Sequence, residues 1–133
     1  MKLDDAAAFA AGLPDVTADL RWGKRTWFVN GHGFVWVRPL GKTDIERFGD
    51  DKPPTGDIIG VIVDGLDAKD ALLAMELPGF FTIEHFKGYA AVLIALRAAR
   101  AKDVRATIRD GWTVAARRKP KKPKKPKPKP KRR

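Results

Sequence analysis

The stretch TWFVNGHGFVWV at residues 26–37 says most about the fold. Its two halves, residues 26–29 and 34–37, are rich in β-branched and aromatic side chains, which favour strands. Between them stands Asn30-Gly31-His32-Gly33, a sequence that favours a tight reversal of the chain. The stretch therefore predicts a β-hairpin.

Upstream of this hairpin, apolar residues at helical spacing predict a helix from Leu3 to Leu13. Two acidic residues stand at its start, and Gly12-Leu13-Pro14 ends the pattern. The segment that joins this helix to the hairpin contains RWGKR at residues 21–25 and is interpreted as a polar link.

Downstream, the pattern alternates between loop, strand and helix. Residues 38–56 hold three prolines and three glycines, which predicts a long loop with one helical turn at residues 43–46, where the spacing fits a capping box. The β-branched run at residues 57–63 predicts a buried strand. Asp67 is predicted to cap a helix that ends at Pro78-Gly79 and turns one face inward, formed by Ala68, Ala71, Leu72 and Met75.

A second hairpin and a final helix complete the predicted fold. Residues 81–86 and 89–96 are expected to pair across Lys87-Gly88. Residues 102–118 carry apolar side chains at helical spacing, although Gly111 costs about 1 kcal/mol relative to alanine, so this helix must depend on packing. The order α-β-β-β-α-β-β-α predicts an α+β fold of two layers, in which helices cover one face of a five-stranded, mainly antiparallel sheet.

Charge divides the chain into two parts. The net charge of +11 is concentrated in residues 117–133, here called the tail, which hold twelve Lys or Arg and no acid, whereas residues 1–116, the body, are close to neutral. The body is predicted to be one folded domain and the tail to be disordered, because Lys, Arg and Pro offer nothing to bury. The absence of cysteine and of an export or membrane-spanning pattern leads us to expect a cytoplasmic protein without a membrane anchor.

The tail is predicted to contact the phosphates of nucleic acid, most simply DNA, with RNA as an alternative. Cationic side chains on an extended chain displace counterions from phosphates without reading bases. A purely solvating tail and attraction to an anionic membrane surface are the other interpretations. The predicted phosphate contacts are Arg117, Arg118, Lys119, Lys121, Lys122, Lys124, Lys125, Lys127, Lys129, Lys131, Arg132 and Arg133.

The body resembles MmcQ/YjbR-like proteins from about residue 13 to residue 116. The likeness rests on RWGKRTWFVNGHGFVWVRPL at residues 21–40, ERFGD at 46–50 and FFTIEHFKGYAAVLIAL at 80–96. It implies a two-layer α-β(3)-α-β(2)-α fold similar to that of secretion chaperones, and DNA binding through two hairpins that act as a double wing. The wings would be the turns at residues 30–33 and at Lys87-Gly88, with Lys87 as their formal cation. The tail resembles the Lys/Pro-rich C-terminal domains of linker histones.

Two groups of body cations are further candidates for phosphate contacts. Arg21, Lys24 and Arg25 precede the first hairpin, and Lys102, Arg105 and Arg109 share one face of the last predicted helix. For both groups, ordinary solvated charge is the alternative.

Reactive groups are scarce, so the chain is predicted not to be an enzyme. It has no serine or cysteine and two histidines, and no phosphate-binding loop, metal-ligand spacing or cofactor fingerprint is present. Tryptophans 22, 27, 36 and 112 are expected in the core, with a ligand groove as the alternative. We expect a nonspecific DNA-binding, nucleoid-associated protein with no cofactor, metal or small-molecule substrate; the alternative is a protein-interaction or chaperone-like module whose tail serves localisation or solubility. The oligomeric state stays open.

Overall fold

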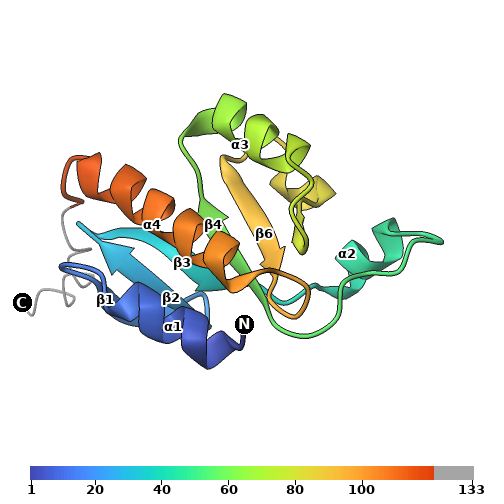
Figure 1. The fold of residues 1–133 in the computed structure, drawn as a ribbon, viewed down its shortest axis with the longest axis horizontal. Coiled ribbons are helices and arrows are strands. Elements are labelled where there is room, and N and C mark those ends of the chain that lie inside the picture. Colours follow the sequence, from blue (N-terminus) through green and yellow to red (C-terminus); the bar gives the residue numbers. More distant parts are fainter. Residues whose placement is uncertain (122–133) are drawn as a thin grey trace, which may run out of the picture.

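The computed structural model describes residues 1–121, which form the α+β fold that the sequence predicts (Figure 1). Four α-helices, a short 3-10 helix (η1) and six strands occupy this part of the chain. In chain order they are α1 (Leu3–Ala11), β1 (Thr17–Arg21), β2 (Lys24–Val29), β3 (His32–Val37), α2 (Lys42–Arg47), β4 (Ile58–Ile62), α3 (Gly65–Ala74), β5 (Phe80–Phe81), η1 (Glu84–Phe86), β6 (Ala91–Ala95) and α4 (Ala101–Arg117).

The strands form one antiparallel sheet in the order β1-β2-β3-β4-β6-β5. The sheet has six strands rather than five, because the segment interpreted as a polar link contains β1. This edge strand pairs with β2 from Thr17 opposite Phe28 to Arg21 opposite Lys24. None of its residues is buried, so it lacks the alternation of apolar side chains that identifies a half-buried strand.

Two tight turns connect the first three strands. At Trp22-Gly23 the φ angles are 51° and 75°, and at Asn30-Gly31 they are 53° and 77°. Positive φ at both central residues matches the twist of antiparallel strands, and Asn-Gly suits it well. Trp22 is a bulky residue in a conformation that favours glycine or asparagine, so this turn carries local strain.

Helices α1 and α4 cover one face of the sheet (Figure 1). Helix α4 packs against β2, β3 and β4, and a Cβ at Gly111 would lie 2.9 Å from Cγ1 of Val61. The predicted cost of a glycine in this helix is thus offset by close approach to β4. Since Val35 pairs with Val61 and Trp36 pairs with Gly60, Val35 points towards α4 and Trp36 points to the opposite, more open face.

The predicted second hairpin is wrong in its details. Strand β5 has only two residues, which pair with Leu93 and Ile94 of β6, and the chain between these strands forms η1 and a turn. Lys87-Gly88 is therefore not the tip of a two-residue hairpin. Ile83 and Phe86, three residues apart, are both buried, which fits the three-residue period of a 3-10 helix rather than the two-residue period of a strand.

The two remaining helices differ from their predictions at the ends and in orientation. Helix α2 begins after Gly41, whose amide donates to the Asp44 carboxylate at 2.9 Å, so Asp44 and not Glu46 caps it. Helix α3 lies beside β6 with Asp64 rather than Asp67 at its N-cap. Met75, expected on its inner face, is 64% exposed. Within residues 1–121 no helix is both long and apolar enough to cross a membrane.

Candidate nucleic-acid interface

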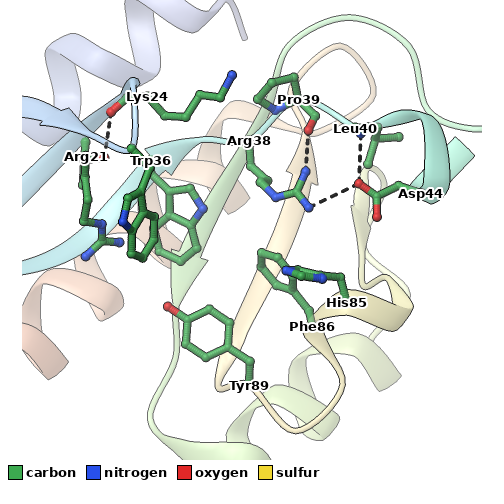
Figure 2. Close-up of a pocket in the computed structure, with 13 residues that line it drawn as sticks. Arg21, Lys24, Trp36, Arg38, Pro39, Leu40, Asp44, His85, Phe86 and Tyr89 are labelled. Carbon is green, nitrogen blue, oxygen red and sulfur yellow. Dashed lines mark hydrogen bonds and ion pairs between the residues drawn. The ribbon is translucent and has the colours of Figure 1, made fainter.

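The open face of the sheet carries a pocket of about 850 Å³ (Figure 2). Strands β1 to β3 form one side of it, and the residues after β3 and the η1 segment form the other. We call it the aromatic pocket, and its lining comprises Arg21, Trp22, Lys24, Thr26, Trp36, Arg38, Pro39, Leu40, Gly41, Asp44, His85, Phe86 and Tyr89.

Three aromatic rings from two distant segments form its apolar wall. Trp36 lies 6.3 Å from Phe86 and 6.2 Å from Tyr89 between ring centroids, and Phe86 and Tyr89 meet edge to face at 5.4 Å. Trp36 occupies this position because Gly60 opposite it has no side chain; a Cβ there would lie 2.5 Å from the indole ring. Tyr89 is 44% exposed, so part of this wall faces solvent.

The guanidinium of Arg21 is held by rings rather than by a carboxylate. Its Cζ lies 5.0 Å from the ring centroid of Trp22, 5.7 Å from that of Phe28 and 5.8 Å from that of Trp36. The side chain crosses the sheet above Gly33, where a Cβ would lie 2.8 Å from a guanidinium nitrogen. No ion pair neutralises Arg21 within residues 1–121. This arrangement fixes the direction of a cation and leaves its charge available.

Arg38 and Lys24 differ in how their charges are balanced. A guanidinium nitrogen of Arg38 donates to the Asp44 carboxylate at 3.2 Å, and the Cζ of Arg38 lies 5.6 Å from the Phe86 ring centroid. Lys24 is exposed at the rim, and no ion pair involves it in the described part of the chain. The pocket thus combines an internally neutralised pair with two cations, Arg21 and Lys24, that lack an anion.

A buried lysine supports the wall from behind. Lys69 on α3 is 5% exposed, and its Nζ donates to the carbonyl oxygens of Phe86 at 2.7 Å and Tyr89 at 2.9 Å. Burial lowers the pKa of Lys69 below its ordinary value of 10.5, and the nearby Asp70 carboxylate partly opposes this effect. Lys69 therefore holds the turn that presents both aromatic side chains to the pocket.

The start of the tail is anchored to the hairpin between β2 and β3. The Asn30 side-chain amide donates to the Ala116 carbonyl at 2.8 Å, and the Lys121 backbone amide donates to the Asn30 carbonyl at 2.8 Å. The Lys119 carbonyl accepts a hydrogen bond from Nε2 of His32 at 2.8 Å. Residues 118–121, here called the tail root, thus lie along this turn, whereas the predicted disorder and phosphate contacts of residues 122–133 fall outside the described residues.

The structure brings only some of the predicted body cations together. Arg21 and Lys24 line the aromatic pocket, but Arg25 packs on Trp27, which faces the helical layer. Lys87 lies outside this pocket, beside α3. A separate set of cations lies on the exposed side of α4, in the layer on the other side of the sheet, and comprises Lys102, Arg105 and Arg109.

Sequence reasoning favoured the core for the tryptophans, with a ligand groove as the alternative, and it did not identify Phe86 and Tyr89 as pocket residues. Trp22 was expected in the core, but it is 88% exposed at the pocket rim. Trp36 is buried as expected and also forms the pocket wall. The signal for Trp22 was its place before Gly23 in a two-residue turn, where a side chain projects away from the sheet.

The remaining groups offer little reactive chemistry. His32 is engaged with the tail root, and His85 is exposed at the pocket rim. Among residues 1–121 no three His, Asp or Glu side chains lie close enough to share a metal ion. An aromatic wall beside two free cations can bind a flat, anionic ligand, whereas it presents no nucleophile next to a base.

Comparison with known proteins gives relatives of the same size. Uncharacterized proteins of Mycobacterium tuberculosis and Mycobacterium bovis are 38% identical to this chain over 115 residues, which cover 85% of the chain and 87% of each relative. The chain belongs to their family. The names of these relatives state no function. No protein-family model matches the chain.

A solved structure supports the fold. The crystal structure of a protein from Pseudomonas syringae, a structural genomics target, superposes with a TM-score of 0.67 at 16% identity, covering 86% of this chain and 99% of that protein. At this identity the likeness concerns the fold alone.

Proposed function

We propose that this protein binds nucleic acid, DNA in the first instance, with little sequence preference. The tail would supply most of the phosphate contacts, and the body would fix where the tail starts. The observation that carries the proposal is the separation of charge: twelve Lys or Arg without an acid at residues 117–133, joined to a nearly neutral body. Such a segment releases counterions from phosphates whatever the base sequence.

The anchored tail root supports this proposal. A backbone hydrogen bond from Lys121 to Asn30 and a side-chain hydrogen bond from His32 to Lys119 tie residues 119–121 to the β2–β3 turn, so the cationic segment leaves the body at a defined place. Lys121 lies against Gly31 of this turn. The guanidinium of Arg21 lies against Gly33, two residues further along the chain. The start of the tail and an unneutralised cation of the body therefore lie against glycines two residues apart in the same hairpin. A phosphate backbone that follows the tail would meet Arg21 next.

The resemblance to MmcQ/YjbR-like proteins points to DNA as well and stays a prediction. Its double-wing arrangement is only partly compatible with this fold, because Lys87-Gly88 is not a hairpin tip. We therefore place body contacts at Arg21 and Lys24 rather than at Lys87. We further propose that the protein acts in the cytoplasm, on the nucleoid, and not as an enzyme.

A protein-interaction module is the second candidate, because β1 is an exposed sheet edge. Leu20 at its end is 64% exposed and is followed by the exposed Trp22. Exposed edges with apolar side chains pair with strands of other chains. In this alternative the tail would serve localisation or solubility.

Binding by the full chain and by a chain that ends at Lys121 separates these candidates. The cut after Lys121 keeps every contact of the tail root and removes eight cations. Nucleic-acid binding predicts that the full chain binds a labelled duplex, that a scrambled duplex competes equally well, and that the shortened chain binds much more weakly. If the full chain does not bind the duplex at low salt, the proposal is wrong.

A further inference from the structure

We propose that the aromatic pocket holds one unpaired nucleobase together with its phosphate. This inference deepens the proposed function, because it assigns to the body a part of nucleic-acid recognition that the tail cannot supply. The tail contains no aromatic residue, so it can neutralise phosphates but cannot stack on bases.

The size and lining of the pocket suit such a ligand. Its volume of about 850 Å³ lies within the range of small-ligand sites, and it combines an aromatic wall with the cationic side chains of Arg21 and Lys24. Tyr89 is 44% exposed, whereas Trp36 and Phe86 beside it are 7% and 4% exposed, so Tyr89 is the ring of this wall that a ligand can reach. A base could therefore stack against this wall. Stacking on these rings would accept every base, since every base has a π-face.

The cations of the pocket favour a ligand whose base carries an anionic group. Arg38 is neutralised by Asp44, whereas Arg21 and Lys24 have no anionic partner in the described chain. Contacts with three rings and with Gly33 favour the orientation in which the Arg21 guanidinium faces the pocket. Two cations at one side of an aromatic wall match a phosphate beside a base.

The position of the pocket links it to the tail. Arg21 lies over Gly33, and the tail root lies against Gly31 of the same hairpin. A strand with one base in the pocket and its phosphate on Arg21 would pass directly to the start of the tail. Bases within a duplex are stacked and cannot enter such a pocket, so the ligand is a single strand or a free nucleotide.

The test uses the full chain, with matched variants that leave the tail intact. R21Q removes the cation of the pocket. R25Q removes the same charge from the same strand pair, but from a side chain that packs on Trp27 away from the pocket. Y89L removes an aromatic wall from a partly exposed position, where the variant is expected to fold. The probes are thymidine, thymidine monophosphate, a dT12 oligonucleotide and a 12-base-pair duplex.

We expect R21Q to weaken binding of thymidine monophosphate and dT12 at least fivefold, and R25Q to weaken it less than twofold. Wild type and R21Q should differ by less than twofold in their affinity for thymidine, which lacks the phosphate. Y89L should weaken binding of dT12 and thymidine monophosphate at least fivefold and leave duplex binding unchanged. If R21Q and Y89L weaken binding of dT12 as much as binding of the monophosphate, a single strand enters the pocket; if they weaken binding of the monophosphate alone, the ligand is a free nucleotide.

Two results separate a failure of this inference from a failure of the proposed function. If dT12 and duplex bind equally and neither R21Q nor Y89L differs from R25Q, the pocket does not bind a base, although the tail still binds nucleic acid. If thymidine monophosphate binds in an R21-dependent manner but neither duplex nor dT12 binds more tightly, the pocket inference stands and the function proposed for the tail is wrong.

Discussion

Replacing Lys69 with methionine tests how the pocket wall is held. Methionine keeps an unbranched apolar stem but removes the ammonium that donates to the Phe86 and Tyr89 carbonyls at 2.7 and 2.9 Å. Both carbonyls keep a backbone donor, the Tyr89 amide for Phe86 and the Ala91 amide for Tyr89, so neither is left without a partner. The loss is that of two hydrogen bonds from a charged donor, each worth about 1.5–3 kcal/mol, and it is partly offset because the cost of burying the ammonium disappears. We therefore expect K69M to lower the free energy of unfolding by about 1–3 kcal/mol.

Denaturation in urea, followed by far-ultraviolet circular dichroism, measures this loss. The matched control is K87M, which removes an exposed lysine from the turn that Lys69 supports. This variant should change the free energy of unfolding by less than about 0.5 kcal/mol. K69M should also weaken binding of thymidine monophosphate, because Phe86 and Tyr89 lose their support. If K69M is as stable as K87M, Lys69 does not hold the turn.

Wild type and K69M should differ in how their stability depends on pH, and the sign of this difference follows from the pKa of Lys69. Because burial lowers the pKa of Lys69 in the folded protein, the unfolded chain binds more protons between that lowered pKa and 10.5. The stability of the wild type therefore gains from rising pH across this window, and it loses this contribution as pH falls through the folded pKa. K69M lacks the group, so the stability difference between the two proteins should widen towards pH 10.5. A difference that narrows there would contradict the account.

Three further substitutions test other parts of the structure. In G111A the new Cβ would lie 2.9 Å from Val61 Cγ1. The cost of overpacking, about 1–3 kcal/mol, should exceed the gain in helix propensity of about 1 kcal/mol, so urea denaturation should show a lower free energy of unfolding. A more stable protein would contradict this packing. G33A should displace the Arg21 guanidinium and lower the affinity for thymidine monophosphate towards that of R21Q; wild-type affinity would refute the placement of that side chain. N30A removes a hydrogen bond to the end of α4 from a residue with φ of 53°, and should cost about 1–3 kcal/mol in thermal or urea unfolding; an unchanged protein would show that the turn does not anchor the helix end.

Several elements could be predicted because their buried side chains follow the spacing of their secondary structure, along one face of α4 and on both faces of the sheet in β3 and β4. The hairpin of β2 and β3, the buried strand β4 and the helix α4 all show the expected spacing of apolar residues. Strand β1 could not be predicted in this way, because it is an exposed edge held by backbone pairing alone. The segment with Phe81 and Phe86 is as rich in aromatic residues as a strand, but its buried positions are three residues apart, so tertiary packing selects a 3-10 turn.

Only the cations of the site could be predicted from the sequence. Arg21 and Lys24 were candidates because they are cations near a hairpin. Residues 21–25 were interpreted as a polar link, so the strand alternation that places Arg25 towards the other face was not expected. The aromatic wall joins Trp36 to Tyr89 across 53 positions of the chain, a contact that depends on the order of β3, β4 and β6. Lys69 was overlooked because a lysine is rarely buried unless it has partners, and its partners are backbone carbonyls.

The central claim is that the tail binds phosphates, and the salt dependence of duplex binding tests it most directly. The measurement is the slope of the logarithm of the binding constant against the logarithm of salt concentration, for the full chain and for the chain that ends at Lys121. Each phosphate neutralised contributes about −0.9, so engagement of half of the twelve tail cations predicts a slope near −5. Removing the last eight cations should flatten the slope by about 4 if half of them are engaged and by about 7 if all are. A slope that is shallow in the full chain, or that is the same in both chains, would contradict the account.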